Sequence, residues 1–320
     1  MAPPFPTIGH IHRETPALDA LIAPDARIER LAGGFTWSEG PVWIDEQDCL
    51  LLSDVPANKM YRWSEEDGLS VFLEPSGYEG SETGIFREPG SNGLVRGPGN
   101  SILMGDHGNR AVAQLDLATR QKTFLATHYE GQRFNSPNDL VRASDGSISF
   151  TDPPYGLEGL NGSPHRELTF NGVYRLMSDG EVRLVDDSLS FPNGILLSAD
   201  GRILYVTVSD PEGAIIVAYA LDEGGNATSR RLFADLTDLV RSGLPGLPDG
   251  MAIDRAGTLF STGPGGVHVF TPEGERLGRI DTGTAVANCT FGGTDGSMLF
   301  LASDSFLARL PTRTTGLRPR

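Results

Sequence analysis

Short apolar runs that end in polar or glycine residues recur along the chain and define its organisation. Six of them read CLLLSD, SILMGD, SISFTD, ILYVTV, TLFSTG and MLFLAS, and they begin at Cys49, Ser101, Ser147, Ile203, Thr258 and Met298. Turn sequences such as SADG, DRAG and TDG precede these runs, and another short apolar segment precedes each turn. Segments of this length bounded by Asp-Gly turns are typical of β-hairpins.

A second pattern opens the segment before each turn. It reads SEGPVW, SNGLVR, SPNDLV, FPNGI, LPDGM and ANCTFGG, and its key polar residues are Glu39, Asn92, Asn138, Asn193, Asp249 and Asn288. These residues recur about every 40 to 55 positions, which is the period of a propeller blade. The sequence therefore predicts an all-β fold, a six-bladed β-propeller. We expect residues 1–320 to form a single domain, with residues 1–38 as an N-terminal extension that supplies the closing strand of the last blade.

The six key residues carry oxygen donors that converge if each opens the innermost strand of its blade. That strand lines the central channel, so residues far apart in the sequence meet at one mouth of it. Two of the six are carboxylates, Glu39 and Asp249, and the others are amides. Such donors suit a hard divalent cation, and two buried carboxylates without a cation would repel each other. The pattern predicts a central metal site.

Turn formation is the alternative interpretation for each key residue taken alone, because Asn-Gly and Asp-Gly are common turn dipeptides. It does not explain Glu39, since Glu is a poor turn former, and each blade has separate turn residues a few positions later. The second strand of each hairpin returns to the same mouth, which places His107 and Asp152 there as well.

Composition and charge exclude several kinds of partner. The formal net charge of −16 argues against nucleic acid and anionic membrane surfaces. We find no segment that resembles a signal peptide or a membrane span, so we expect a cytoplasmic protein that is a monomer or a dimer. Cys49 and Cys289 are expected to be reduced, buried thiols, and they could pair only if the two ends of the chain meet in space.

Several motifs together resemble those of the gluconolactonase and regucalcin (senescence marker protein) family of six-bladed propellers. They are SEGPVW, NRAV, RFNSPNDLV, FTDPPYGL, NGVYRL, FPNGI, LYVT, LPDGM and FGG. The resemblance covers residues from Phe35 to Arg309, and DPPYG following SPNDL is similar to the bacterial gluconolactonase branch. It implies a divalent ion at the channel mouth, with Ca²⁺ as the first choice and Mg²⁺, Mn²⁺ or Zn²⁺ as alternatives.

The same resemblance assigns roles to individual residues. It makes Glu39, Asn193 and Asp249 metal ligands, with Asn138 adjacent or also ligating, and it makes Asp249 the general base. Ser136 stands where the regucalcin branch has a substrate-contacting Arg. The substrate-binding candidates are Asn92, His107, Asn138, Asp152 and Asn288, and Asp139 is expected to support the metal ligands.

These groups suffice for metal-dependent hydrolysis of a sugar lactone such as gluconolactone. A cation polarises the carbonyl and a base takes a proton from water, and the chain has no G-x-S-x-G nucleophile motif. His107 either contributes to substrate contact or proton transfer, or only lines the channel wall. Asp152 either lines the pocket or fixes the turn before Pro153, and Tyr155 either covers the mouth or packs in the core.

Two other functions stay open on the sequence alone. One is hydrolysis of a different lactone or of an organophosphate ester on the same metal cradle. The other is a non-enzymatic calcium-binding propeller, which would need neither a base nor an open face on the ion.

Overall fold

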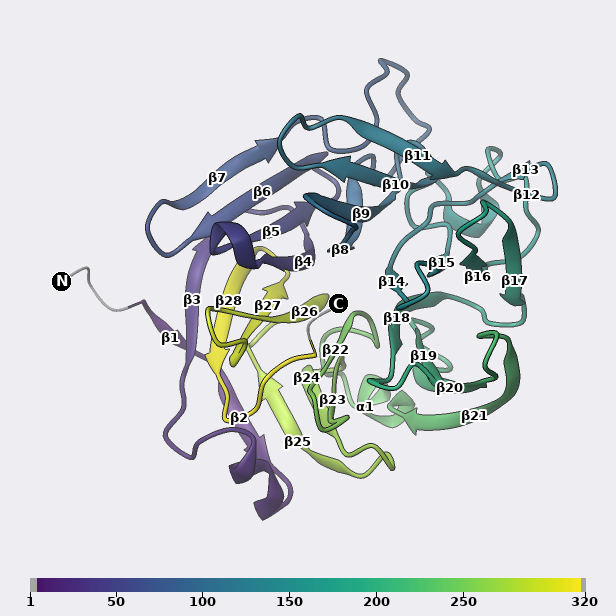
Figure 1. Ribbon diagram of the computed structural model, residues 1–320. Coiled ribbons are helices and arrows are strands. Elements are labelled where there is room, and N and C mark those ends of the chain that lie inside the picture. Colours follow the sequence, from purple (N-terminus) through teal and green to yellow (C-terminus); the bar gives the residue numbers. More distant parts are fainter. Residues whose placement is uncertain (1–4, 318–320) are drawn as a thin grey trace.

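Six β-sheets are arranged in a ring about a central channel in the computed structural model, which describes residues 5–317 (Figure 1). Each sheet is an antiparallel blade of four or five strands. The strand that opens the repeated hairpins of a blade lies innermost, next to the channel. The all-β, six-bladed propeller predicted from the repeats is confirmed.

The first three blades are each built from four strands in chain order. Blade 1 contains β4 (Ser38–Ile44), β5 (Cys49–Asp54), β6 (Lys59–Ser64) and β7 (Gly68–Leu73). Blade 2 contains β8 (Ser91–Arg96), β9 (Ser101–Asp106), β10 (Ala111–Asp116) and β11 (Lys122–Ala126). Blade 3 contains β14 (Leu140–Arg142), β15 (Ile148–Asp152), β16 (Gly172–Leu176) and β17 (Val182–Asp186).

Blade 4 has the same four-stranded form, whereas the last two blades also take strands from the N-terminal segment. Blade 4 contains β18 (Pro192–Leu197), β19 (Ile203–Val208), β20 (Ile215–Leu221) and β21 (Ala227–Asp235). Blade 5 contains β22 (Met251–Ile253), β23 (Leu259–Gly263), β24 (Gly266–Phe270), β25 (Arg276–Asp281) and the added outer strand β2 (His10–Arg13). Blade 6 contains β26 (Asn288–Gly292), β27 (Met298–Ser303), β28 (Phe306–Pro311), β3 (Ile28–Gly33) and β1 (Thr7–Ile8).

The two ends of the described chain meet in blade 6. β3 pairs antiparallel with β28, so an early strand forms the outer part of the last blade. Arg309 Nε donates to Glu29 Oε2 at 2.7 Å across this seam, although the two residues are 280 positions apart in the sequence. The ring is therefore closed by hydrogen bonds and an ion pair between distant parts of the chain.

The hydrophobic core consists of layers between neighbouring blades. In β5, Leu50 and Leu52 pack toward blade 6 with Phe300, whereas Cys49 and Leu51 pack toward blade 2 with Met104. Both faces of such a strand are buried, which explains why the sequence shows continuous apolar runs and not a simple alternation. Cys49 and Cys289 are both buried and free, and they lie in different layers of this core.

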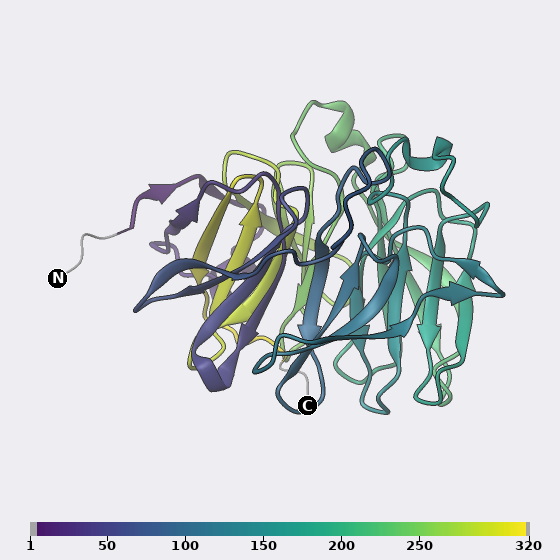
Figure 2. The same ribbon diagram turned by 90° about the horizontal axis from the view of Figure 1, so that it is seen from above.

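The remaining elements are short. They are the hairpin β12 (His128–Tyr129) and β13 (Gln132–Arg133), the 3₁₀ helices η1 (Pro16–Ala20), η2 (Asp45–Gln47) and η3 (Leu160–Gly162), and the helix α1 (Thr237–Arg241). Figure 2 shows α1, in green, and several loops rising above one face of the ring. Because α1 belongs to the segment that leads into β22, this is the face at which inner strands begin. None of the helices in residues 5–317 has the length and apolar character needed to span a bilayer.

Candidate active site

The structure places all six key residues at or just before the start of an inner strand. The inner strands surround the central channel (Figure 1), so the six residues gather at one mouth of it. Five of the six side chains are buried, and Asp249 is half-buried. They are Glu39 in β4, Asn92 in β8, Asn138 two residues before β14, Asn193 in β18, Asp249 two residues before β22 and Asn288 in β26.

Local irregularities of the inner strands accompany the key residues. The pairing of the inner strand with the second strand shifts register next to Glu39, Asn92 and Asn193. A bulge of this kind re-aims a side chain without ending the strand, and such bulges are common beside active sites.

Three of the glycines that directly follow key residues, Gly93, Gly194 and Gly250, are not turn glycines. Gly201, in the turn between β18 and β19, has φ +70° and open space where a Cβ would lie. Gly194, which follows Asn193, has no positive φ, and a Cβ there would collide with the backbone oxygen of Asp249 in the next blade. Gly93 is crowded by the side chain of Asp139 and the backbone oxygen of Asn138, and Gly250 by the side chain of Asn288. The turn interpretation is wrong for these positions, because close approach of adjacent blades requires the glycine.

We expect Gly194→Ala to lower the free energy of unfolding by about 1–3 kcal/mol, the usual cost of forcing atoms into a packed region. Gly213→Ala in the same blade is the matched control, since Gly213 has no positive φ and a Cβ added there would have open space around it. Urea denaturation of both variants measures the effect. Equal stability of the two variants would contradict the close-approach explanation.

Hydroxyl groups of second strands fix the key residues of the following blade. Ser53 Oγ donates to Asn92 O at 2.9 Å, Thr151 Oγ1 to Asn193 O at 2.6 Å, and Thr207 Oγ1 to Asp249 O at 2.9 Å. Each donor lies near the end of a second strand and reaches across the blade interface. The backbone that carries the site is therefore held by the neighbouring blade.

The amides form a directed chain of hydrogen bonds across the mouth. Asn92 Nδ2 donates to Asn138 Oδ1 at 2.8 Å, and Asn138 Nδ2 donates to Asn193 Oδ1 at 2.6 Å. Asn193 Nδ2 then donates to Ser209 Oγ at 2.8 Å, and Ser209 Oγ donates to Pro248 O at 2.5 Å. Asn138 thus orients its neighbours, and Asn92 Oδ1 is buried with no hydrogen-bond partner among the described residues.

The two carboxylates of the mouth share an unfavourable environment. Burial raises the pKa of Glu39 from its ordinary 4.5 to about 8, although Gly40 N and Asn288 Nδ2 donate to its Oε2 at 2.8 and 3.2 Å. Burial also raises the pKa of Asp249 well above its ordinary value, and the charge of Glu39 raises it further. Each of the two carboxylates disfavours ionisation of the other. A bound cation would offset this repulsion and favour the ionised form of both.

His107 is fully buried between a carboxylate and an amide. Its Nε2 lies 3.0 Å from Asn138 Oδ1, and because that oxygen can only accept, Nε2 is the donor. Its Nδ1 lies 3.5 Å from Glu88 Oε2. Burial alone would raise the pKa of Glu88, but His107 and Arg87 outweigh it and hold that pKa below its ordinary value. The ring is fixed in position beside Asn138, and its role in chemistry stays a prediction.

Three of the residues singled out in the sequence hold loops or backbone. Asp139 Oδ1 accepts from Leu140 N at 2.9 Å and its Oδ2 from Ile195 N at 3.2 Å, which is a supporting arrangement. Asp152 accepts from Asn135 N and Ser136 N, both at 2.8 Å, and is fully buried. Ser136 Oγ donates to Pro153 O at 2.6 Å and accepts from Gly156 N at 2.9 Å. The carboxylate of Asp152 therefore fixes the segment at Asn135 and Ser136 and not the turn before Pro153, and its contact with substrate stays a prediction.

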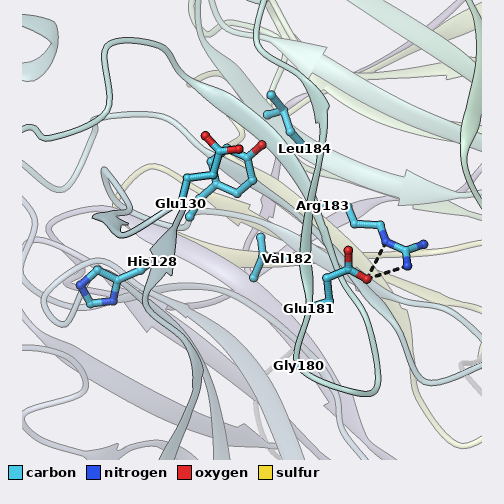
Figure 3. Close-up of a pocket in the computed structure, with 8 residues that line it drawn as sticks. His128, Glu130, Gly180, Glu181, Val182, Arg183 and Leu184 are labelled. Atoms are coloured by element: carbon cyan, nitrogen blue, oxygen red, sulfur yellow. Dashed lines mark hydrogen bonds and ion pairs between the residues drawn. The ribbon is translucent and has the colours of Figure 1, made fainter.

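Two features of the described residues limit where a metal or ligand can lie. Among residues 5–317, no three His, Cys, Asp or Glu side chains are grouped so that they could hold a metal ion alone, so a site at the mouth depends on amide oxygens as well. A separate pocket of about 500 Å³ lies at the outer edge of blade 3, between β12 and β17 (Figure 3). Its Arg183 is already paired with Glu181, and it contains none of the key residues.

Sequence reasoning missed Glu88, Ser209 and the donor hydroxyls. Glu88 lies in the loop between β7 and β8, and no repeat marks it. The hydroxyls did leave a signal, because Ser or Thr recurs near the ends of LLSD, SFTD, YVTV and FSTG. That recurrence has a structural reason only once adjacent blades are seen in contact.

The fold and this mouth define a class: a six-bladed β-propeller with carboxylates and amides gathered at one end of its channel. Residues 37–305 match the family model described as SMP-30/Gluconolactonase/LRE-like region. The chain therefore belongs to the SMP-30/gluconolactonase family.

Individual relatives agree with this membership. A gluconolactonase of Zymomonas mobilis is 45% identical over 314 residues, which is 97% of this chain and 88% of that protein. The solved structure of a gluconolactonase from Xanthomonas campestris is 33% identical with a TM-score of 0.81, covering 98% of this chain and 99% of that one. A calcium-binding regucalcin from Agrobacterium tumefaciens is 18% identical with a TM-score of 0.70, covering 99% and 98%, a likeness of fold alone.

Proposed function

We propose that this protein is a hydrolase of carboxylic ester bonds that opens a sugar lactone of the gluconolactone type, with a divalent metal ion at the channel mouth. The observation that carries the proposal is the 45% identity to a gluconolactonase across nearly the whole chain. The buried oxygen donors gathered at one mouth of the channel support the proposed metal ion.

The residues at the mouth fit a hard divalent cation. Glu39 and Asp249 supply negative charge, and both are buried or half-buried carboxylates whose ionisation is suppressed when no cation is near. Asn193 supplies an amide oxygen that Asn138 holds in place, and Asn92 Oδ1 is a further acceptor without a partner among residues 5–317. Oxygen donors without sulfur or imidazole favour Ca²⁺, and Mg²⁺ or Mn²⁺ next. We propose Glu39, Asn193 and Asp249 as the ligands, with Asn138 orienting Asn193.

The reaction needs water, a base and a polarised carbonyl. A bound divalent cation would polarise the carbonyl oxygen of the lactone and favour the ionised form of nearby carboxylates. Asp249 accepts a proton from the attacking water, and the resulting hydroxide adds to the carbonyl carbon. The ring C–O bond then breaks, the ring oxygen takes up the proton that Asp249 accepted, and the product is a hydroxy acid. Asn92 and His107 both donate to Asn138 Oδ1, and we propose them as substrate-binding residues beside it.

Hydrolysis of a lactone panel by the purified protein tests this function. The panel contains gluconolactone, a pentonolactone, an unsubstituted lactone and an organophosphate ester, each assayed with added Ca²⁺, Mg²⁺ or Mn²⁺ and with a strong chelator. We expect hydrolysis of a sugar lactone that the chelator abolishes and that added metal restores. Full activity of metal-free protein in chelator would contradict the metal role, and exclusive organophosphate hydrolysis would contradict the substrate class.

A further inference from the structure

The hydroxyl of Tyr155 is buried at the channel mouth and has no hydrogen-bond partner within residues 5–317. Tyr155 belongs to the loop that follows β15, at the face where the inner strands begin. Its ring stacks on Phe191, with centroids 6.0 Å apart and planes inclined by 8°. Phe191 directly precedes β18 and stands two residues before Asn193. This stack places the phenol next to the predicted metal ligands.

The groups around this hydroxyl do not use its proton. Burial raises the pKa of Tyr155, and the carboxylate of Asp249 raises it further, so the hydroxyl lies within electrostatic reach of the proposed base and keeps its proton. Ser209 Oγ is also close, but it donates its one proton to Pro248 O and accepts from Asn193 Nδ2, and no hydrogen bond joins it to the phenol. A buried donor without an acceptor costs free energy, and an oxygen of a bound ligand would remove that cost.

The loop that carries Tyr155 is fixed on both sides. Ser136 Oγ bonds to Pro153 O and Gly156 N, which flank Tyr155. The backbone amides of Arg87 and Glu88 donate to Gly156 O at 3.0 and 3.3 Å, and thereby join this loop to the one before β8. A donor held in this way is preorganised, so that little conformational freedom is lost when it binds a ligand.

We propose that Tyr155 donates a hydrogen bond to a hydroxyl group of the bound sugar lactone and so helps to select hydroxylated lactones over unsubstituted ones. The inference rests on the proposed function and names a specificity-determining residue for it. Asp249 acts at the ester bond that is hydrolysed, whereas Tyr155 binds a hydroxyl group of the substrate that does not react. The stacked ring of Phe191 supports the phenol ring.

Tyr155→Phe removes the hydroxyl and keeps the ring, so its kinetics on two substrates test the proposal. For gluconolactone we expect KM to rise about 3- to 10-fold, the effect of losing one neutral hydrogen bond. For δ-valerolactone, which has no hydroxyl groups, we expect KM and kcat to match those of the parent. Metal content should not change, and the melting temperature of the ligand-free protein should not fall, because the hydroxyl makes no hydrogen bond within the described residues.

Tyr174→Phe is the matched control. Tyr174, in β16, also has a buried hydroxyl without a partner in the described part of the chain, but its ring stacks on Phe150 inside blade 3. We expect this variant to equal the parent on both lactones. Unchanged kinetics of Tyr155→Phe on gluconolactone, or equal losses on both lactones, would overturn the proposal while leaving the proposed function intact. A parent protein that opens neither lactone would instead overturn the proposed function, and this inference with it.

Discussion

Asp249→Asn is expected to lower the turnover of lactone hydrolysis by about 10²–10⁴-fold, the usual contribution of a positioned base. Asn is nearly the same size as Asp and keeps one carbonyl oxygen for a metal, but it cannot accept a proton near neutral pH. The backbone of this residue is held by Thr207 Oγ1, which donates to Asp249 O, so the variant should fold normally. Steady-state kinetics with increasing metal concentration measure the loss.

The response to excess metal separates the two roles of Asp249. Asn193→Ala removes a proposed ligand and no base, so excess metal should restore part of its activity. Saturating metal should not restore Asp249→Asn, because the missing function is proton acceptance. If saturating metal fully restores Asp249→Asn, Asp249 is only a ligand, and His107 or Glu39 becomes the candidate base.

Glu39→Gln is expected to weaken binding of Ca²⁺ by about 10²-fold or more, because it removes one of two negative charges from the proposed ligand set. Titration calorimetry on the metal-free proteins measures this directly. Asp139→Asn is the comparison, since both oxygens of Asp139 accept backbone hydrogen bonds and it should affect metal affinity less. Similar affinities of the parent and Glu39→Gln would contradict the ligand assignment.

In the metal-free protein, Glu39→Gln is expected to reduce the loss of stability as the pH rises. The pKa of Glu39 is about 8 in the folded state and 4.5 in its ordinary state, so folding favours the neutral carboxyl. The stability that this group contributes is therefore present below its ordinary pKa and is lost as pH rises through about 8. Gln at position 39 stays neutral, so the unfolding free energy of Glu39→Gln in chelator should fall less between pH 5 and pH 8 than that of the parent. Urea denaturation at both pH values checks it, and equal falls would contradict the shift.

Repetition made two features predictable, the fold and the gathering of the key residues at one mouth of the channel. Asn193 and Asp249 occupy equivalent places in successive blades, and a ring brings equivalent places together whatever their separation in the sequence. The strand that closes the ring could be expected too, because a propeller needs an outer strand for its last blade.

Residues outside the repeat could not be placed in this way. Glu88 reaches His107 from a loop whose path depends on its contact with Gly156 in another loop. The direction of the amide chain through Asn138 depends on which neighbour each amide group faces, and residue types alone do not determine that. The role of Asp152 could not be predicted either. Its carboxylate lies at the end of a second strand and accepts hydrogen bonds from two backbone amides of a loop.

The seam in blade 6 has a consequence for the order in which the protein becomes folded during synthesis. β3 leaves the ribosome long before β28, its hydrogen-bonding partner, because the residues that the seam joins are as much as 280 positions apart. Until β28 emerges, β3 has an unpaired edge, and unpaired strand edges promote association with other chains. Nascent chains stalled before Phe306 should therefore depend on chaperones more than complete ones do, and the ring acquires its closed form only as a late event in translation.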